Sequence, residues 1–283
     1  MAALDMADQL FRVDGKVAVV TGAGEGMGRA IAVDLARAGA RVAVLDIAEE
    51  RMRETVKAIE ADGGTALPVV CDISSETEVE LAFDAIDQRF GHVDILVNNA
   101  GVNVVSAAAK DYPLDGWDRT LAINLTGSFL CARAAGRRML ARGAGGSIIN
   151  ISSIVSVSAA DRGSLAFGAA KAGVDQMTKD LAVEWARDGI RVNAVLPCQF
   201  RTRGWAETVA DPANEELVRT VLHGIPMGRM GEPEEIAGPV RFLASDAASM
   251  VTGVLLPVDG GNLAMNAGAG GLWPSRRVVA EVR

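Results

Sequence analysis

A glycine-rich stretch, Thr21–Gly28 with the sequence TGAGEGMG, constrains the fold more than any other part of the chain. It follows the apolar run Val17–Val20 and opens an amphipathic segment, Arg29–Ala38, so it joins a strand to a helix. Glycines permit a tight turn and the close approach of a pyrophosphate, which the free N–H groups of the helix N-terminus attract. The stretch predicts a dinucleotide-binding turn, and an ordinary strand-to-helix turn is the alternative.

An acidic residue further along the chain favours a dinucleotide. Asp46 ends the next apolar run, 20 residues after Gly26, and this spacing suits a carboxylate that hydrogen-bonds the adenosine ribose. Such a carboxylate repels the 2′-phosphate of NADP, and Glu25 adds a second negative charge in a stretch without a basic residue. We therefore expect NAD(H) as the cofactor. A solvated helix cap is the other role open to Asp46.

The rest of the chain alternates between strand-like and helix-like patterns. Apolar residues recur at helical spacing between most of the strand-like runs, as with Ile31 and Leu35. Apolar strands separated by helices predict a parallel sheet that is covered on both faces. We expect a doubly wound, Rossmann-like α/β fold with seven strands in one domain, 12–265, between an N-terminal extension, 1–11, and a C-terminal tail, 266–283. The expected strands are Val17–Val20, Arg41–Leu45, Ala66–Val70, Val93–Val97, Ser147–Ile151, Ile190–Leu196 and Val254–Val258.

Composition and charge argue against several classes of protein. The net charge of −8 and the lack of a basic patch disfavour nucleic acid and anionic membranes as partners. No apolar run is long enough to span a bilayer, and the acidic N-terminus does not resemble a signal peptide. Three distant cysteines fit a reduced, cytoplasmic chain. The two histidines form no ligand-spaced cluster, so no metal site is expected.

Polar residues follow the ends of the third, fourth and fifth expected strands, the edge where ligands bind in a parallel sheet. Asp72, next to Ile73, can either meet the adenine amino group or start a helix, with the two following serines as rival caps. In Asn98–Gly101, small residues let the chain pass against a cofactor, and the asparagine amides can tie adjacent strand ends together. Ser153 follows the fifth strand.

Two further polar residues lie in apolar helical stretches. Asn124 needs hydrogen-bond partners there, as either a structural bracket or part of a polar relay. Lys171 shares a helix face with Phe167, four residues earlier, and a surface lysine is the alternative interpretation.

Together these motifs resemble the short-chain dehydrogenase/reductase superfamily over residues 12–263. The resemblance rests on TGAGEGMG at 21–28, NNAG at 98–101, Asn124, Ser153, Lys171, the segment 197–202, the segment 226–237 and VDGG at 258–261. It implies a nucleotide-binding fold, usually tetrameric, and a catalytic set that here comprises Asn124, Ser153, Phe167 and Lys171. It also implies a cofactor site formed by Gly22, Glu25, Gly26, Met27, Gly28, Asp46, Asp72, Ile73, Asn99, Ala100, Gly101, Lys171, Pro197, Phe200 and Thr202.

Three positions depart from the family pattern. Phe167 stands where the family has its catalytic tyrosine, and Cys198 stands in place of the glycine after Pro197. The spacing from Ser153 to Lys171 is one residue longer than in the commonest form. The chain's single tyrosine, Tyr112, matches no catalytic position.

The resemblance implies hydride transfer between nicotinamide and a secondary alcohol or ketone. Because Phe167 cannot transfer a proton, three explanations stand: an engineered change that lowers activity, a natural enzyme that uses water or Ser153, and a catalytically silent NAD-binding scaffold or sensor. The segment 203–224 is either an apolar lid over a small-molecule substrate or ordinary helix packing.

A homotetramer is expected from the resemblance and from a long apolar helix, Phe167–Trp185. Val174, Met177, Leu181 and Ala182 are the candidates for its partner face. The tail can reach a neighbouring subunit through Leu272 and Trp273, and disorder is the alternative.

Overall fold

A seven-stranded sheet forms the centre of the protein in a computed structural model, which describes residues 9–159 and 163–265. All strands are parallel, and their order is β3-β2-β1-β4-β5-β6-β7. The seven expected strands are confirmed, each to within two residues at its ends. They are β1 (Val17–Thr21), β2 (Arg41–Asp46), β3 (Thr65–Val70), β4 (Ile95–Asn98), β5 (Gly146–Ile151), β6 (Ile190–Pro197) and β7 (Leu255–Val258).

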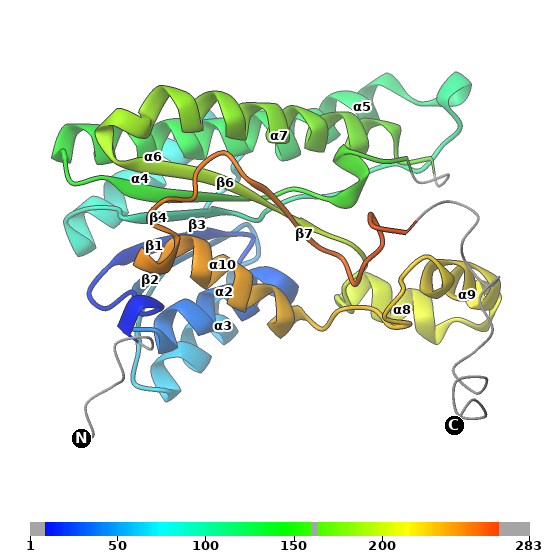
Figure 1. Ribbon diagram of the computed structural model, residues 1–283, viewed down its shortest axis with the longest axis horizontal. Coiled ribbons are helices and arrows are strands. Elements are labelled where there is room, and N and C mark those ends of the chain that lie inside the picture. The colour runs from blue at the N-terminus through cyan, green and yellow to red at the C-terminus, as the bar shows by residue number, and fades with distance from the viewer. Residues whose placement is uncertain (1–8, 160–162, 266–283) are drawn as a thin grey trace, which may run out of the picture.

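Helices cover both faces of the sheet, which confirms the doubly wound α/β fold. Figure 1 shows α2, α3 and α10 on one face and α4, α6 and α7 on the other. A π-helical turn, η2 (Ala122–Gly127), joins α5 to α6. The helices are α2 (Gly26–Arg37), α3 (Glu49–Ala61), α4 (Glu76–Phe90), α5 (Leu114–Leu121), α6 (Ser128–Arg142), α7 (Leu165–Trp185), α8 (Arg203–Ala210), α9 (Glu215–His223) and α10 (Ala237–Ala244).

Each face of the sheet has its own apolar core, because successive strand side chains point to opposite faces. Ile31 and Leu35 of α2 pack in the first core. Phe83 and Ile86 of α4 pack in the second, together with Trp185 of α7. Within the described ranges, no helix combines the length and the apolar character that a membrane crossing requires.

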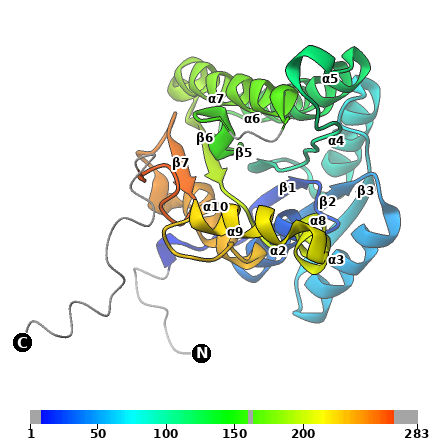
Figure 2. The same cartoon turned by 90° about the vertical axis from the view of Figure 1, so that its right-hand side faces the viewer.

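The strand order reverses between β1 and β4. In sheets of this kind such a reversal forms a crevice at the carboxyl ends of the strands, which is the usual place for a ligand. The helices α8 and α9 stand apart from both helix layers, close to where β6 ends (Figure 1). From the side view they lie in front of α2 and α10 (Figure 2).

The expected partner face of α7 needs a correction at two of its four residues, whereas Met177 and Leu181 are partly exposed. Val174 and Ala182 are 1% and 2% exposed, because this face of the helix packs against the subunit's own sheet. Neither residue is accessible to another subunit. Val183, at 81% exposure, lies on the outer face instead. The tail residues 266–283, with Leu272 and Trp273, and residues 1–8 lie outside the described residues.

Candidate active site

The glycine-rich stretch folds into a turn that only glycine can form at several positions. Gly22 and Gly26 have φ angles of 61° and 56°, in the left-handed region. A Cβ atom on Gly28 would lie 2.1 Å from the carbonyl oxygen of Gly22. Helix α2 begins at Gly26, and the side chain of Glu25 at its N-cap makes no capping hydrogen bond. The first-turn N–H groups therefore have no side-chain cap, and uncapped N–H groups of this kind suit a pyrophosphate.

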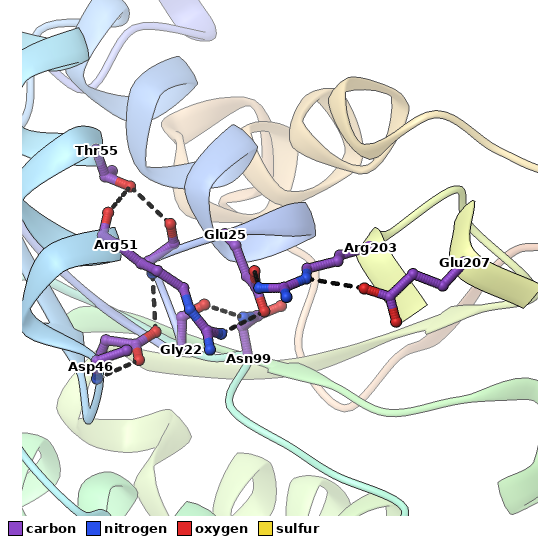
Figure 3. Close-up of polar contacts among 10 residues, drawn as sticks. Gly22, Glu25, Asp46, Arg51, Thr55, Asn99, Arg203 and Glu207 are labelled. Carbon is purple, nitrogen blue, oxygen red and sulfur yellow. Dashed lines mark hydrogen bonds and ion pairs between the residues drawn. The ribbon is translucent and has the colours of Figure 1, made fainter. Parts of the chain in front are cut away.

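Asp46 at the end of β2 is fixed against this turn. Its Oδ2 accepts a hydrogen bond from the N–H of Gly24 and its Oδ1 accepts one from the N–H of Ala48, both at 2.9 Å (Figure 3). Each carboxylate oxygen has further lone pairs. The carboxylate can therefore accept two ribose hydroxyls without losing either backbone contact.

A basic residue that sequence reasoning missed lies beside Glu25. The Nη1 atom of Arg51, in α3, donates to Oε1 of Glu25 at 2.6 Å (Figure 3). Arg203, which begins α8, has its Nη1 atom 4.0 Å from Oε2 of Glu25, and its Nε donates to Glu207 at 3.1 Å. Glu25 is therefore an ion-paired carboxylate, and its negative charge is balanced by a residue from a different element.

The NNAG segment ties the ends of β4 and β1 together across the crevice. Thr21 accepts, through its Oγ1, the backbone N–H groups of Asn99 and Ala100, both at 3.0 Å. The Nδ2 atom of Asn99 donates to the carbonyl oxygens of Thr21 at 2.9 Å and Gly22 at 3.1 Å. The asparagine amide thus holds the glycine-rich turn in place, as the sequence suggested for this segment.

Asn124 lies in η2, fully buried, and brackets the chain that follows NNAG. Its Nδ2 donates to the carbonyl oxygens of Val102 and Thr120, both at 2.8 Å, and its Oδ1 accepts the N–H of Val102 at 3.2 Å. A Cβ atom on Gly101 would lie 2.7 Å from Oδ1 of Asn124 and 3.3 Å from Nζ of Lys171. These contacts support the bracket role, and a part in a polar relay stays a prediction.

Lys171 is buried beneath the end of β5, so the alternative of a surface lysine is wrong. Lys171 is 4% exposed, and its Nζ donates a hydrogen bond to the carbonyl oxygen of Ile151 at 2.8 Å. Nζ also lies 5.5 Å from the centre of the Phe167 ring. Burial lowers the pKa of Lys171 to about 8, and the nearby Asp175 carboxylate opposes that shift. Phe167 and Lys171 thus share one helix face.

Ser153 lies two residues after Ile151, the residue whose carbonyl oxygen binds Lys171. It directly follows Ser152 and β5, and its Oγ accepts the N–H of Val155 at 3.4 Å. The hydroxyl can therefore donate its own proton to a ligand oxygen. Ser152 binds α7 by donating to the carbonyl oxygen of Lys171 at 3.3 Å, which fixes the helix against the strand end.

The other expected cofactor residues lie around the same crevice. Ser75, and not Asp72, caps α4, because its Oγ accepts the N–H of Glu78 at 3.3 Å. Asp72 instead accepts hydrogen bonds from Ser74, and its contact with adenine stays a prediction. A Cβ atom on Gly26 would lie 3.4 Å from Cγ2 of Thr202, so the chain after β6 reaches the glycine-rich turn.

The remaining cofactor candidates are mainly apolar. Ile73 and Phe200 are buried at 6% and 4% exposure, and Met27 packs against the first core. Pro197 is the last residue of β6.

The segment 203–224 shows the helix packing considered for it, and its role as a lid over a substrate stays a prediction. Trp205 and Leu222 pack around buried Val221, which is ordinary helix packing. Val209 and Leu217 are exposed at 39% and 38%, however, and Val209 lines a hollow of about 660 Å³ beside α8 and α9.

Comparison with known proteins places residues 22–262 in a family model described as Enoyl-(Acyl carrier protein) reductase. The chain is 43% identical over 251 residues to D-threitol dehydrogenase of Mycolicibacterium smegmatis, covering 89% of this chain and 94% of that protein. It is 41% identical over 254 residues to NAD-dependent glycerol dehydrogenase of Listeria innocua, covering 90% and 96%. The crystal structure of a gluconate 5-dehydrogenase from Burkholderia cenocepacia, in complex with NADP and tartrate, has a TM-score of 0.84 at 36% identity, covering 92% of this chain and 100% of that one.

Proposed function

Since the chain belongs to the short-chain dehydrogenase/reductase superfamily, we propose that it is an NAD(H)-dependent oxidoreductase acting on secondary alcohols and ketones. Relatives named as dehydrogenases of threitol and glycerol support an alcohol substrate. The observation that carries the proposal is the position of Lys171 and Ser153 at the end of β5, across the crevice from the glycine-rich turn. This arrangement supports a nucleotide site and a polar reaction site, both at the carboxyl ends of the strands.

The residues of the crevice fit a nicotinamide dinucleotide. The N-terminus of α2 would hold the pyrophosphate, Asp46 the adenosine ribose and Lys171 the nicotinamide ribose. The bound nucleotide would supply the hydride acceptor or donor. Ser153 would donate a hydrogen bond to the substrate oxygen, and the Lys171 ammonium would stabilise negative charge that develops there.

Phe167 sets the limit on this chemistry. Its ring fills the position of the family's phenol and lies over Lys171, but it offers no proton. General acid–base catalysis typically contributes about 10²–10⁴-fold in rate. We therefore infer slow turnover, with water or Ser153 as the remaining route for the proton.

A catalytically silent NAD-binding scaffold or sensor is the second candidate function, and Phe167 is the observation that favours it. Intact Ser153 favours the enzyme, because a silent NAD-binding protein would still use Lys171 to hold the nucleotide and Asn124 to bracket the chain. A protein that binds NAD yet oxidises or reduces nothing, even after Phe167→Tyr, would favour the scaffold.

The preference for NAD over NADP now rests on Asp46 alone. Glu25 is paired with Arg51, so displacement of Glu25 would free a guanidinium for the 2′-phosphate. The gluconate 5-dehydrogenase described above was crystallised with NADP, so a similar structure can hold the 2′-phosphate. We still propose NAD, because the Asp46 carboxylate lies at the end of β2, where the motif predicts the adenosine ribose, and two backbone contacts fix it there.

Calorimetric titration with NAD and NADP tests the cofactor assignment. We expect NAD to bind at least about tenfold more tightly, a difference of about 1.4 kcal/mol. Asp46→Asn should narrow that gap, because it removes the charge and keeps the shape. Asp62→Asn is a matched control, since Asp62 pairs with Arg37 on the surface. Tighter binding of NADP by the parent chain would refute the assignment.

We also propose a homotetramer, assembled in part through the outer face of α6 and α7. Phe129 and Val183 are exposed at 42% and 81% on these helices. Light scattering at micromolar protein should give four times the chain mass. A monomer mass under these conditions would contradict the proposal.

A further inference from the structure

A group of polar side chains is buried behind Lys171, inside a core that is otherwise apolar. Asn98 of β4 and Asn150 of β5 lie opposite each other in register, and Nδ2 of Asn98 donates to Oδ1 of Asn150 at 2.9 Å. Nδ2 of Asn150 donates to Oγ1 of Thr178 in α7 at 2.8 Å. All three residues are at most 3% exposed. The group therefore connects two central strands to the helix that carries Lys171.

Asp175 belongs to the same buried face of α7. It lies one helical turn after Lys171 and three residues before Thr178, and it is 4% exposed. Among the described residues, no hydrogen-bond donor reaches either of its carboxylate oxygens. A buried carboxylate without partners is costly, so it calls for a compensating charge or an internal water molecule.

Lys171 is the charged group positioned to compensate Asp175. Burial disfavours the ammonium form and lowers the pKa of Lys171 to about 8, and the charge of Asp175 acts in the opposite direction. The two groups do not hydrogen-bond directly, since both Asp175 oxygens are without a donor. A water molecule can bridge a pair of this kind, because it donates to the carboxylate and accepts a hydrogen bond from the ammonium.

Other charged groups on the elements that pack against α7 are exposed or already bound. The guanidinium of Arg191 in β6 donates to the carbonyl oxygens of Leu243 and Ser245. The exposed ones are Asp115, Asp118 and Arg119 of α5, and Arg187 and Asp188 after α7. Asp175 is thus the buried counter-charge available to Lys171.

We propose that Asp175 is a positioning residue that keeps Lys171 protonated in the empty and nucleotide-bound protein. The role of Lys171 toward the nucleotide rests on the function proposed above, whereas the pairing of the two charges does not. Without the carboxylate, the buried amine loses its proton at a lower pH. A neutral amine donates weaker hydrogen bonds to a ribose and does not stabilise negative charge on a substrate oxygen.

The direct test measures the protonation of Lys171 without any nucleotide. Labelling of amines with acetic anhydride, followed residue by residue by mass spectrometry from pH 6 to 11, gives the midpoint at which Lys171 becomes reactive. In Asp175→Asn we expect this midpoint to fall by about one pH unit, the effect of removing one nearby opposite charge. Asp180→Asn is the matched control on the same helix, because Asp180 is exposed and binds Gln176. Its midpoint should equal that of the parent.

A second variant covers the case in which Asp175→Asn does not fold. Asp175→Glu keeps the charge, so its Lys171 midpoint should stay within about half a pH unit of the parent's. Equal midpoints in the parent and Asp175→Asn, or a fallen midpoint in Asp175→Glu, would overturn the proposal.

Binding of NADH, followed by its fluorescence over the same pH range, separates this proposal from the proposed function. The parent should lose affinity as pH rises through the Lys171 midpoint, and Asp175→Asn should lose it about one unit earlier. A shifted labelling midpoint with no NADH binding at any pH would support the charge pair and refute the nucleotide function. If the protein binds NADH but the labelling midpoint of Lys171 is the same in the parent and in Asp175→Asn, the nucleotide function is supported and the charge pair is refuted.

Discussion

Gly28→Ala should disrupt the glycine-rich turn through a single methyl group. The added Cβ would lie 2.1 Å from the carbonyl oxygen of Gly22 and 2.4 Å from Nδ2 of Asn99. Both neighbours belong to the strand ends that the asparagine amide holds together. A gap of at least 3.0 Å is needed, so the Gly22 carbonyl must retreat and its 3.1 Å hydrogen bond from Asn99 must break.

The magnitude follows from these two effects. Overpacking a well-packed site costs about 1–3 kcal/mol, and loss of one hydrogen bond adds roughly 0.5–1.5 kcal/mol. At roughly 2–4 °C per kcal/mol for a chain of this size class, the melting temperature should fall by about 3–18 °C. NAD affinity should fall at least about tenfold, because the same shift displaces the N–H groups that face the pyrophosphate.

Thermal unfolding by circular dichroism and titration with NAD measure both effects. Gly204→Ala is the control, since a Cβ atom there meets nothing within 4 Å and the residue lies in α8. It should leave stability within about 1 kcal/mol of the parent. If Gly28→Ala matches this control in both melting temperature and NAD affinity, the turn is not as tight as described and the reasoning fails.

Two further predictions concern the reaction site. The pKa of Lys171 is about 8 in the folded protein, below the ordinary lysine value of 10.5, so between these pH values the unfolded chain holds a proton that the folded chain has released. The stability of the parent relative to Lys171→Met should therefore rise with pH across that window, by at most about 1.4 kcal/mol per pH unit, as measured by urea unfolding. A flat or falling difference would place the folded pKa elsewhere. Asn124→Ala should cost about 2–4 kcal/mol in the same assay and weaken NADH binding, because it leaves the N–H and C=O of Val102 without their partners. Unchanged stability would show that the bracket contributes nothing.

Most of the fold could be predicted from local pattern. The strands are nearly continuous apolar runs, and burial on both faces leaves little room for another arrangement. The glycine-rich turn is recognisable because strand, glycines and helix follow one another along the chain. Asp46 is recognisable because the number of residues between it and Gly26 is nearly fixed by one strand-helix-strand unit.

What could not be predicted depends on contacts between distant or ambiguous residues. Arg51 and Glu25 lie on different elements, and two charged residues far apart in sequence give no sign that they pair. Val174 and Ala182 were assigned to a partner face because α7 is apolar on several sides, so periodicity did not distinguish the inner face from the outer. Asp175 gave no signal either, because a single aspartate in a helix is usually exposed.

The most direct test of the account compares the parent chain with Phe167→Tyr. A panel of secondary alcohols and ketones is screened with saturating NAD or NADH, and turnover is followed by nicotinamide absorbance. The added hydroxyl would lie on the helix face of Lys171, so the tyrosine variant should turn over about 10²–10⁴-fold faster with nearly unchanged NADH affinity. A parent chain that already turns over at ordinary enzyme rates, about 1–10³ s⁻¹, and gains nothing from the hydroxyl would contradict the account.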